Sequence, residues 1–205
     1  MGFYNKYVLP KLTDWACKQN PNMRQREKVI PLAYGKVLEV GIGTGLNLTY
    51  YDPSRVDHLT GIDPSEDNWK MRSVNDQDIG FQIDFILSSA DNIPADNNQF
   101  DSAVITYTLC SIIDPVISLE EIRRVLKPKG QLIFCEHGLA PDKNIRQWQH
   151  TLNPLWKMIS GGCNMTRDIP DLLHQGGFEI KDMDTLYLPG WRILSYNFWG
   201  TACAK

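Results

Sequence analysis

The sequence lacks a long apolar run, and it has no large excess of charge of either sign. Its first residues contain no apolar stretch of signal-peptide or membrane-span length, so we expect no N-terminal membrane anchor. The net charge of −3 argues against a surface that binds nucleic acid or another polyanion. The 205 residues, of which 42% are hydrophobic, are enough for a full core, and we expect one domain spanning residues 1–205.

Cysteine is also sparse, with five residues scattered along the chain and no C-x-x-C pair. This spacing indicates neither a zinc site nor a disulfide framework, and we expect no bound metal ion. Reduced cysteines are typical of the cytosol, so the pattern predicts a cytoplasmic protein.

The most informative stretch is the glycine-rich run at residues 37–45. Its apolar beginning predicts a short buried strand, which Gly41, Gly43 and Gly45 then interrupt, and residues 46–51 are expected to start a helix. A turn between a strand and a helix N-terminus offers free backbone N–H donors to a ligand. A glycine turn without any ligand is the alternative, because a glycine loop alone is a weak signal.

The spacing of the glycines indicates which ligand the turn would hold. A dinucleotide-binding loop reads G-x-G-x-x-G/A, but Leu46 stands where its third small residue belongs, and Gly45 comes one position early. Glu39 would repel a pyrophosphate but suits an ammonium group. These features favour S-adenosylmethionine (SAM) over a nicotinamide dinucleotide. The pattern E-x-G-x-G-x-G resembles motif I of the class I SAM-dependent methyltransferases, which implies S-adenosylhomocysteine as the product.

Asp63 ends a second predicted strand at residues 59–63, beyond the glycine loop. An acid about one βαβ half-unit after such a loop is well placed to accept hydrogen bonds from both ribose hydroxyls. Two other roles stay open: Asp63 would cap the helix that is expected after Pro64, or it would simply face solvent.

Residues 81–87 alternate apolar side chains and predict a third strand, which the polar segment 88–94 follows. This segment resembles the G-D-A-x-x-L-P stretch of the same methyltransferases, in which an acid and the next backbone amide hold the adenine. Ser89 stands at the usual position of the acid. The resemblance therefore implies that the Ala90 amide and Asp91 contact the adenine, and a polar loop without that role is the alternative for Asp91.

The order of the elements predicts an α/β fold. Strands are expected at residues 37–40, 59–63, 81–87, 102–106, 131–136, 178–188 and 193–204. Helices are expected at residues 3–17, 24–33, 114–124 and 144–176. Strands and helices alternate until the last two strands, which form an antiparallel hairpin. We therefore expect a Rossmann-like, doubly wound and mostly parallel seven-stranded sheet with a C-terminal antiparallel hairpin.

Two further segments are placed by this layout. Residues 1–35 are expected to form an N-terminal helical cap that packs on its own domain. A lid over the site and a peripheral contact with a membrane surface are the alternatives for this cap. Tyr107 follows the strand at residues 102–106, and open α/β sheets bind ligands at the carboxyl ends of their strands. Tyr107 is therefore expected beside the cofactor.

The family resemblance extends over nearly the whole chain. Residues 123–130 resemble the R-V-L-K-P-G-G helix end of the methyltransferases that include ubiquinone and menaquinone biosynthesis enzymes. Residues 148–178 look like the animal methyltransferase-like thiol S-methyltransferases, which carry an N-terminal membrane anchor. This implies an enzyme that methylates a small-molecule acceptor, with an alkyl thiol first and a quinone precursor or a phospholipid headgroup as alternatives. A SAM-binding protein without turnover also remains open.

His137, after the strand at residues 131–136, is the expected catalytic residue, as a base or a positioning group, because a thiol must ionise before it attacks. A histidine hydrogen-bonded to a neighbouring loop is the alternative. The sequence reveals no base partner for Cys110 or Cys163, so neither is expected to be a nucleophile.

Three aromatic residues and one arginine are weaker candidates for the acceptor side. Tyr107, Trp148 and Trp156 are candidates for the wall of the acceptor pocket, although core packing is the commoner role for such residues. Arg167 is a candidate for binding an acidic group of the acceptor, with a salt bridge inside the fold as the commoner role.

Overall fold

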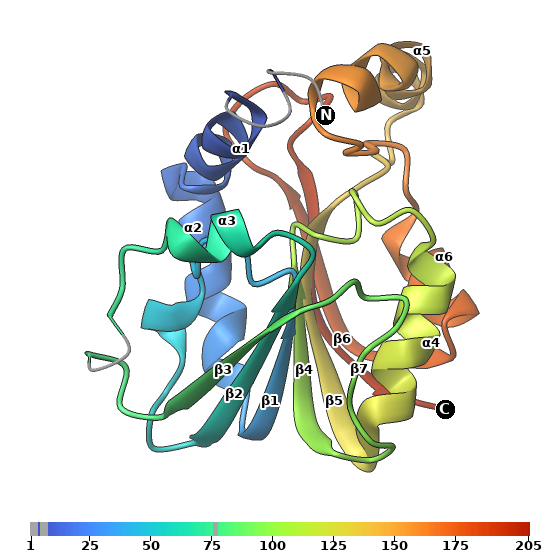
Figure 1. Ribbon diagram of the computed structural model, residues 1–205. Coiled ribbons are helices and arrows are strands. Elements are labelled where there is room, and N and C mark those ends of the chain that lie inside the picture. The colour runs from blue at the N-terminus through green and yellow to red at the C-terminus, as the bar shows by residue number, and fades with distance from the viewer. Residues whose placement is uncertain (1–3, 5–7, 76–77) are drawn as a thin grey trace.

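The chain forms a seven-stranded sheet with helices on both of its faces (Figure 1). The computed structural model describes residue 4 and residues 8–75 and 78–205. The strands follow the order β3-β2-β1-β4-β5-β7-β6. Their bounds are β1 Gly35–Val40, β2 Val56–Asp63, β3 Gln82–Leu87, β4 Phe100–Thr106, β5 Leu126–His137, β6 Phe178–Tyr187 and β7 Tyr196–Ala204.

Strands β1 to β5 pair in parallel, whereas β7 runs antiparallel to both β5 and β6. The predicted Rossmann-like sheet with a C-terminal hairpin is therefore confirmed. The chain order reverses between β1 and β4, which are neighbours in the sheet. Connections leave these two strands in opposite directions, and this opens a crevice beyond their carboxyl ends.

The helices divide between the two faces and the carboxyl edge of the sheet (Figure 1). Their bounds are α1 Leu9–Cys17, α2 Asn20–Val29, α3 Glu66–Lys70, α4 Pro115–Val125, α5 Lys143–Ile159 and α6 Ile169–Gln175. Helices α4 and α6 pack on one face and α2 on the other. Helices α1 and α5 lie at the top of Figure 1, near the carboxyl ends of the parallel strands.

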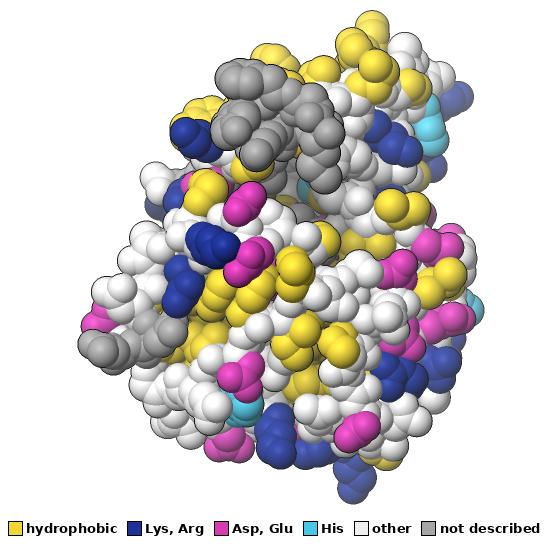
Figure 2. Space-filling model, in the orientation of Figure 1, with side chains coloured by type: hydrophobic (Ala, Val, Ile, Leu, Met, Phe, Trp, Pro, Cys, Tyr) yellow, Lys and Arg dark blue, Asp and Glu magenta, His cyan; other side chains and the backbone are white. Residues whose placement is uncertain are grey.

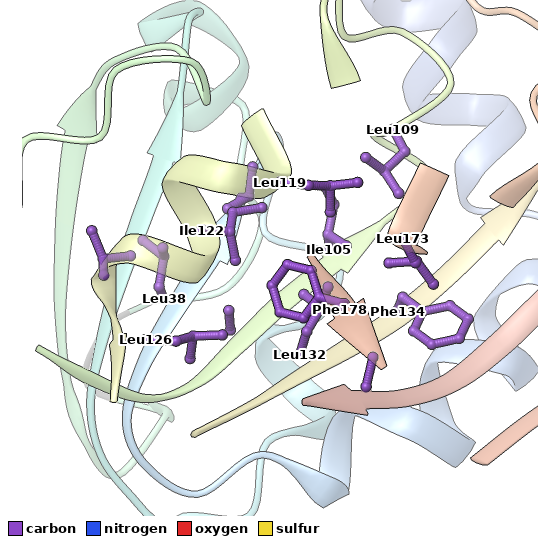
Figure 3. Packing of buried hydrophobic residues seen from close by; sticks show 14 of the residues in the cluster. Leu38, Ile105, Leu109, Leu119, Ile122, Leu126, Leu132, Phe134, Leu173 and Phe178 are labelled. Carbon is purple, nitrogen blue, oxygen red and sulfur yellow. The ribbon is translucent and has the colours of Figure 1, made fainter. Parts of the chain in front are cut away.

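Two hydrophobic clusters, one on each face, hold the helices to the sheet. On the α4 side, Leu119 and Ile122 pack against Ile105, Phe134 and other fully buried side chains (Figure 3). Burying each such side chain contributes about 1.5–3 kcal/mol. This packing fixes the strand ends, and with them the loops that form the site.

The segment after β1 differs from the expectation. The predicted helix at residues 46–51 is wrong: the chain makes turns and then a single 3-10 turn, η3 Leu48–Tyr50. The Asn47 side chain is drawn inward by hydrogen bonds to Glu39 and Thr106, and Pro53 disfavours helix at the residue before it. A helix N-terminus is therefore not part of this loop.

Several other boundaries also move. Pro10 lies in the first turn of α1, and residues 3 and 5–7 of the helix expected at residues 3–17 lie outside the described residues. Strand β5 begins at Leu126, five residues before the start of the strand expected at residues 131–136. Ser65, and not Asp63, caps α3, with its hydroxyl accepting from Asn68 N at 3.3 Å. Among the described helices, none is long and apolar enough to span a membrane.

Candidate functional site

A cavity of about 530 Å³ opens at the carboxyl ends of β1, β2 and β4. Every predicted cofactor residue lines it except Gly45. The lining residues from that set are Glu39, Gly41, Gly43, Asp63, Ala90, Asp91 and Tyr107. Residues predicted from separate stretches of the sequence thus meet around one cavity.

The glycine loop is shaped by backbone conformations that favour glycine. Gly41 and Gly43 have φ of +73° and +53°. A Cβ on Gly41 would lie 2.4 Å from the Thr108 side chain, whereas at Gly43 the nearest atom is 3.9 Å away. The space in front of Gly43 is therefore open to the cavity. The N–H of Gly43 donates to Asp63 Oδ2 at 3.0 Å, so this amide is already used within the protein.

The carboxyl of Glu39 is buried at the base of the cavity. Asn47 Nδ2 donates to its Oε1 at 2.9 Å, and the Tyr51 hydroxyl donates to its Oε2 at 2.7 Å. Burial nonetheless raises the pKa of Glu39 to about 7, because desolvation outweighs both hydrogen bonds and the nearby Arg26 cation. A cationic ligand beside this carboxyl would favour its ionised form.

The sequence did not single out Arg26, although it connects three parts of the site. Its guanidinium donates to Asn47 Oδ1 and to Thr106 Oγ1, both at 2.6 Å, and it lies 5.0 Å from the centre of the Tyr107 ring. Arg26 belongs to α2, a surface helix by its sequence, and nothing in its local pattern distinguishes it from a solvent-exposed arginine. Its burial follows from the packing of α2 across the sheet.

Asp63 ends β2 and is only 7% exposed. In addition to Gly43 N, it accepts the Ser65 N–H at 2.8 Å. Burial raises the pKa of Asp63, while these two backbone hydrogen bonds lower it. The carboxylate thus ties the glycine loop to the end of β2 and still lines the cavity.

The segment after β3 brings Ser89, Ala90 and Asp91 into the lining of the cavity. The Ser89 hydroxyl is in a short hydrogen bond with Asp91 Oδ1. Asp91 is exposed, so its carboxylate is accessible from the cavity mouth.

Tyr107 lines the cavity just beyond β4 in a strained conformation, with φ of +51°. Its N–H donates to Cys135 O at 2.9 Å, and its hydroxyl donates to Asn197 Oδ1 at 2.8 Å. These bonds hold the side chain between the sheet and the cavity. Strain of this kind at a strand end is typical of ligand sites.

Helix α1 covers the cavity from the side opposite the sheet. Leu9, Asp14 and Cys17 line it, and Thr44 of the glycine loop donates its hydroxyl to Asp14 Oδ1 at 2.6 Å. A Cβ on Gly161, after α5, would lie 2.7 Å from the Leu9 side chain. Helix α1 therefore packs on its own domain, in a position over the cavity that resembles a lid.

His137 does not line this cavity in the described chain. Its Nε2 lies 3.1 Å from Cys163 Sγ, so the expectation that Cys163 lacks a base partner is wrong. Hydrogen bonding with the Cys110 thiol and the charge of His137 lower the pKa of Cys163, although burial raises it. Burial lowers the pKa of His137, but the Cys163 thiolate raises it more. We call Cys110, His137 and Cys163 the Cys–His cluster.

The other acceptor-side candidates are also placed elsewhere. Trp148 is 57% exposed on α5, and among the three aromatic candidates only Tyr107 lines the cavity. Arg167 donates to the Leu109 and Ile112 carbonyl oxygens in short hydrogen bonds and forms no ion pair with the described residues. Its contacts are with the loop after β4, so the expected salt bridge is not found among the described residues, and binding of an acidic acceptor group by Arg167 stays a prediction.

Comparison with known proteins shows which family this chain belongs to. Residues 38–134 match the family described as a methyltransferase domain. The chain is 30% identical over 172 residues to human thiol S-methyltransferase TMT1A, which covers 81% of this chain and 69% of that protein. It is 32% identical over 194 residues to human thiol S-methyltransferase TMT1B, and this match covers 88% of this chain and 78% of that protein. The chain belongs to the class I SAM-dependent methyltransferases.

A solved SAM-dependent methyltransferase from Thermotoga maritima has the same fold as this methyltransferase. The two superpose with a TM-score of 0.65 at 20% identity, over 98% of each chain. The cofactor of the family is SAM, which confirms the predicted cofactor and enzyme class. The cavity fits such a ligand, since it combines a buried carboxyl, an open glycine loop and a second carboxylate at the end of β2.

Proposed function

We propose that this methyltransferase transfers a methyl group from SAM to a small alkyl thiol. The similarity to the two thiol S-methyltransferases carries the proposal, because it covers 81% and 88% of the chain, whereas the methyltransferase-domain match ends at residue 134. The additional similarity includes residues beyond β5. A segment that leaves the carboxyl edge of the sheet is well placed to select the acceptor.

The cofactor is proposed to lie in the cavity, where different residues would bind its ammonium group, its ribose and its adenine. Glu39 would bind the ammonium group beside Gly41 and Gly43, with Gly45 shaping the loop. Asp63 would accept hydrogen bonds from the ribose hydroxyls. The Ala90 amide and Asp91 would contact the adenine, and Tyr107 would form a wall beside the cofactor, because all three residues line the same cavity.

When bound, SAM supplies a methyl group that its sulfonium already activates. The protein's own contribution is to orient the acceptor and exclude water, which in favourable cases is worth about 7–11 kcal/mol. Helix α1 suits the second task, because Leu9 and Cys17 cover the cavity. Residues 1–205 are proposed to act as one methyltransferase domain, with residues 1–35 as its cap.

A thiol acceptor has to be ionised, because the thiolate is the nucleophile. The proposal that His137 takes this proton stays a prediction. In the structure its Nε2 is directed at Cys163 Sγ, 3.1 Å away, so an acceptor thiol would have to compete with Cys163 for it. The decisive measurement is therefore how the turnover lost in His137→Ala depends on the pKa of the acceptor thiol.

The test measures S-adenosylhomocysteine formation with a series of alkyl and aryl thiols that differ in pKa. Turnover is expected with small apolar thiols, and His137→Ala should lower it while SAM affinity stays near that of the wild type. The loss should shrink for acceptors of lower pKa, which ionise without help. No turnover with any thiol would remove the substrate class, and an equal loss across the series would remove His137 as the base.

The alternatives are separated in the same assay. A quinone precursor and a phospholipid headgroup are tested beside the thiols, and turnover with one of these alone would redefine the acceptor. If SAM binds calorimetrically but no acceptor gives S-adenosylhomocysteine, the protein is a SAM-binding protein without turnover. The reducing cytoplasm remains the proposed compartment, in keeping with five free cysteines in the structure.

We also propose that α1 and α5 form a peripheral contact with a membrane surface. Both helices expose large apolar side chains, such as Trp15 on α1 and Leu155 and Met158 on α5, and Figure 2 shows apolar side chains gathered at the top of the molecule. Helix α5 carries basic residues and no carboxylate. An amphipathic, basic helix of this kind suits an anionic lipid surface.

Sedimentation with vesicles that contain anionic lipid tests this contact. The wild type is expected to co-sediment, and Leu155→Glu should reduce the bound fraction. Leu87→Glu is the matched control, because Leu87 is also exposed but lies on β3. Equal binding of both variants and the wild type would contradict the proposal.

A further inference from the structure

The Cys–His cluster is a group of potential metal ligands, of which only His137 has a proposed role in methyl transfer. Cys110 comes from the loop after β4, His137 is the last residue of β5, and Cys163 follows α5. Their sulfur and nitrogen ligand atoms all lie within 4.8 Å of one another, with Cys163 Sγ 3.1 Å from His137 Nε2. Three segments that are distant in sequence thus direct soft donor atoms at one point.

The donor set selects the class of metal ion. Two cysteine sulfurs and one imidazole nitrogen suit Zn²⁺, whereas Mg²⁺ and Ca²⁺ prefer oxygen ligands. With Zn–S near 2.3 Å and Zn–N near 2.0–2.1 Å, ligand atoms of a tetrahedral site lie about 3.5–3.8 Å apart. Cys163 Sγ and His137 Nε2 lie 3.1 Å apart, and no pair of the three ligand atoms is more than 4.8 Å apart, so shifts of about 1 Å would complete three corners of a tetrahedron.

Burial and charge favour a cation at this point. Cys110 is 3% exposed. Glu136, next to His137 in β5, accepts the Thr108 and Leu109 N–H groups with Oε1, but its buried Oε2 has no hydrogen-bond partner among the described residues. A zinc ion with two thiolates and a neutral imidazole carries no net charge, which lowers the cost of burying it. The unpartnered carboxylate oxygen adds negative potential nearby.

We propose that Cys110, His137 and Cys163 bind one Zn²⁺ ion, which joins the loop after β4, the end of β5 and the segment after α5. Three protein ligands leave a fourth position for another donor. The site lies outside the lining of the cofactor cavity, so it does not depend on SAM. A bound zinc ion would use the imidazole nitrogen that faces Cys163, so the metal and base roles of His137 are alternatives.

The first experiment uses the reduced, full-length protein after metal has been removed with a chelator. Zn²⁺ is titrated and the bound metal is counted after gel filtration, and Co²⁺ is added in parallel as a spectroscopic substitute. We expect one metal ion per chain, together with thiolate-to-cobalt charge-transfer absorption and the intense visible bands of tetrahedral cobalt. A wild-type protein that retains no zinc, or shows only the weak bands of hydrated cobalt, overturns the proposal.

The second experiment compares Cys110→Ser, His137→Gln and Cys163→Ser with Cys203→Ser. Cys203 is the matched control, because it is also a free cysteine but lies outside the cluster. It is on β7, opposite Gln131 of β5, which is six residues from His137. Each cluster variant should lose more zinc affinity than the roughly 10–100-fold that loss of an outer-shell partner costs. Cys203→Ser should keep the wild-type affinity and cobalt spectrum.

Thermal unfolding and SAM binding control for the integrity of the variants. Zinc should raise the Tm of the wild type and of Cys203→Ser but not that of the cluster variants. SAM affinity should persist in folded variants, so failure of zinc binding is distinguishable from failure of the proposed methyl transfer. Unchanged zinc affinity in Cys163→Ser, or equal losses in Cys163→Ser and Cys203→Ser, would refute the site.

Discussion

The glycine loop and the Cys–His cluster both lie at the carboxyl edge of the sheet, and the chain builds them in opposite ways. The loop comes from one continuous stretch, residues 37–45, in which Gly41 and Gly43 are needed for their positive φ. The cluster comes from three segments, and no two of its members are close in sequence. A local backbone requirement defines the first region, and sheet order defines the second.

Each region has a buried carboxyl whose pKa burial raises to about 7, Glu39 beside the loop and Glu136 beside the cluster. Both oxygens of Glu39 accept hydrogen bonds from side chains, from Asn47 and Tyr51. Only one oxygen of Glu136 is satisfied, by two backbone amides, and the other has no partner in the described chain. Burial thus raises the pKa of both carboxyls, yet of the two only Glu39 lines the cofactor cavity.

The largest effect is expected from adding a methyl group to the glycine loop. Gly41→Ala combines a left-handed backbone, which costs about 1–2 kcal/mol, with overlap on Thr108, which adds about 1–3 kcal/mol. Gly162→Ala, beside the Cys–His cluster, has a φ of +92° but its Cβ would meet nothing closer than 3.8 Å. Urea denaturation should therefore show a clearly larger loss of unfolding free energy for Gly41→Ala, and equal losses would contradict the local account of the loop.

A smaller effect is expected where the cofactor should meet β2. Asp63→Ala should weaken SAM binding by about 1–3 kcal/mol, as for a hydrogen bond to a charged group. It also removes the acceptor for Gly43 N and Ser65 N, so the loop should loosen as well. Asp57→Ala, at the exposed start of the same strand, is the control. Calorimetry that gives wild-type SAM affinity for folded Asp63→Ala would count against the ribose role.

The smallest effect is a pH dependence that should distinguish the two carboxyls. Below its pKa of about 7, Glu39 is mostly neutral, and a ligand cation favours the ionised form. SAM affinity should therefore rise as the pH increases toward 7, by at most about tenfold per unit, and level off above it. The dependence should vanish in Glu39→Gln and persist in Glu136→Gln. A flat profile in the wild type would show that Glu39 does not respond to the ammonium group.

The sequence by itself determined the alternation of strands and helices, the glycine turn and the acids that face its cavity. These features are local: an apolar strand, a positive φ and an acid at a strand end are each encoded within a few residues. The helix start at Asp114 is of the same kind, because its carboxylate accepts the Val116 and Ile117 N–H groups and so caps the helix. The helix expected at residues 46–51 failed because long-range hydrogen bonds to Asn47 outweighed the local pattern.

Only the tertiary structure decided which distant residues share a site. Arg26 reaches Asn47 and Thr106 because α2 packs across the sheet, and no local signal marks it as buried. Cys163 meets His137 because the segment after α5 returns to the carboxyl edge where β5 ends. Such contacts follow from strand order and helix packing, which are set by the combined burial of many apolar side chains and not by any one motif. The physical reason is that local patterns fix backbone conformation, whereas proximity between segments depends on the fold as a whole.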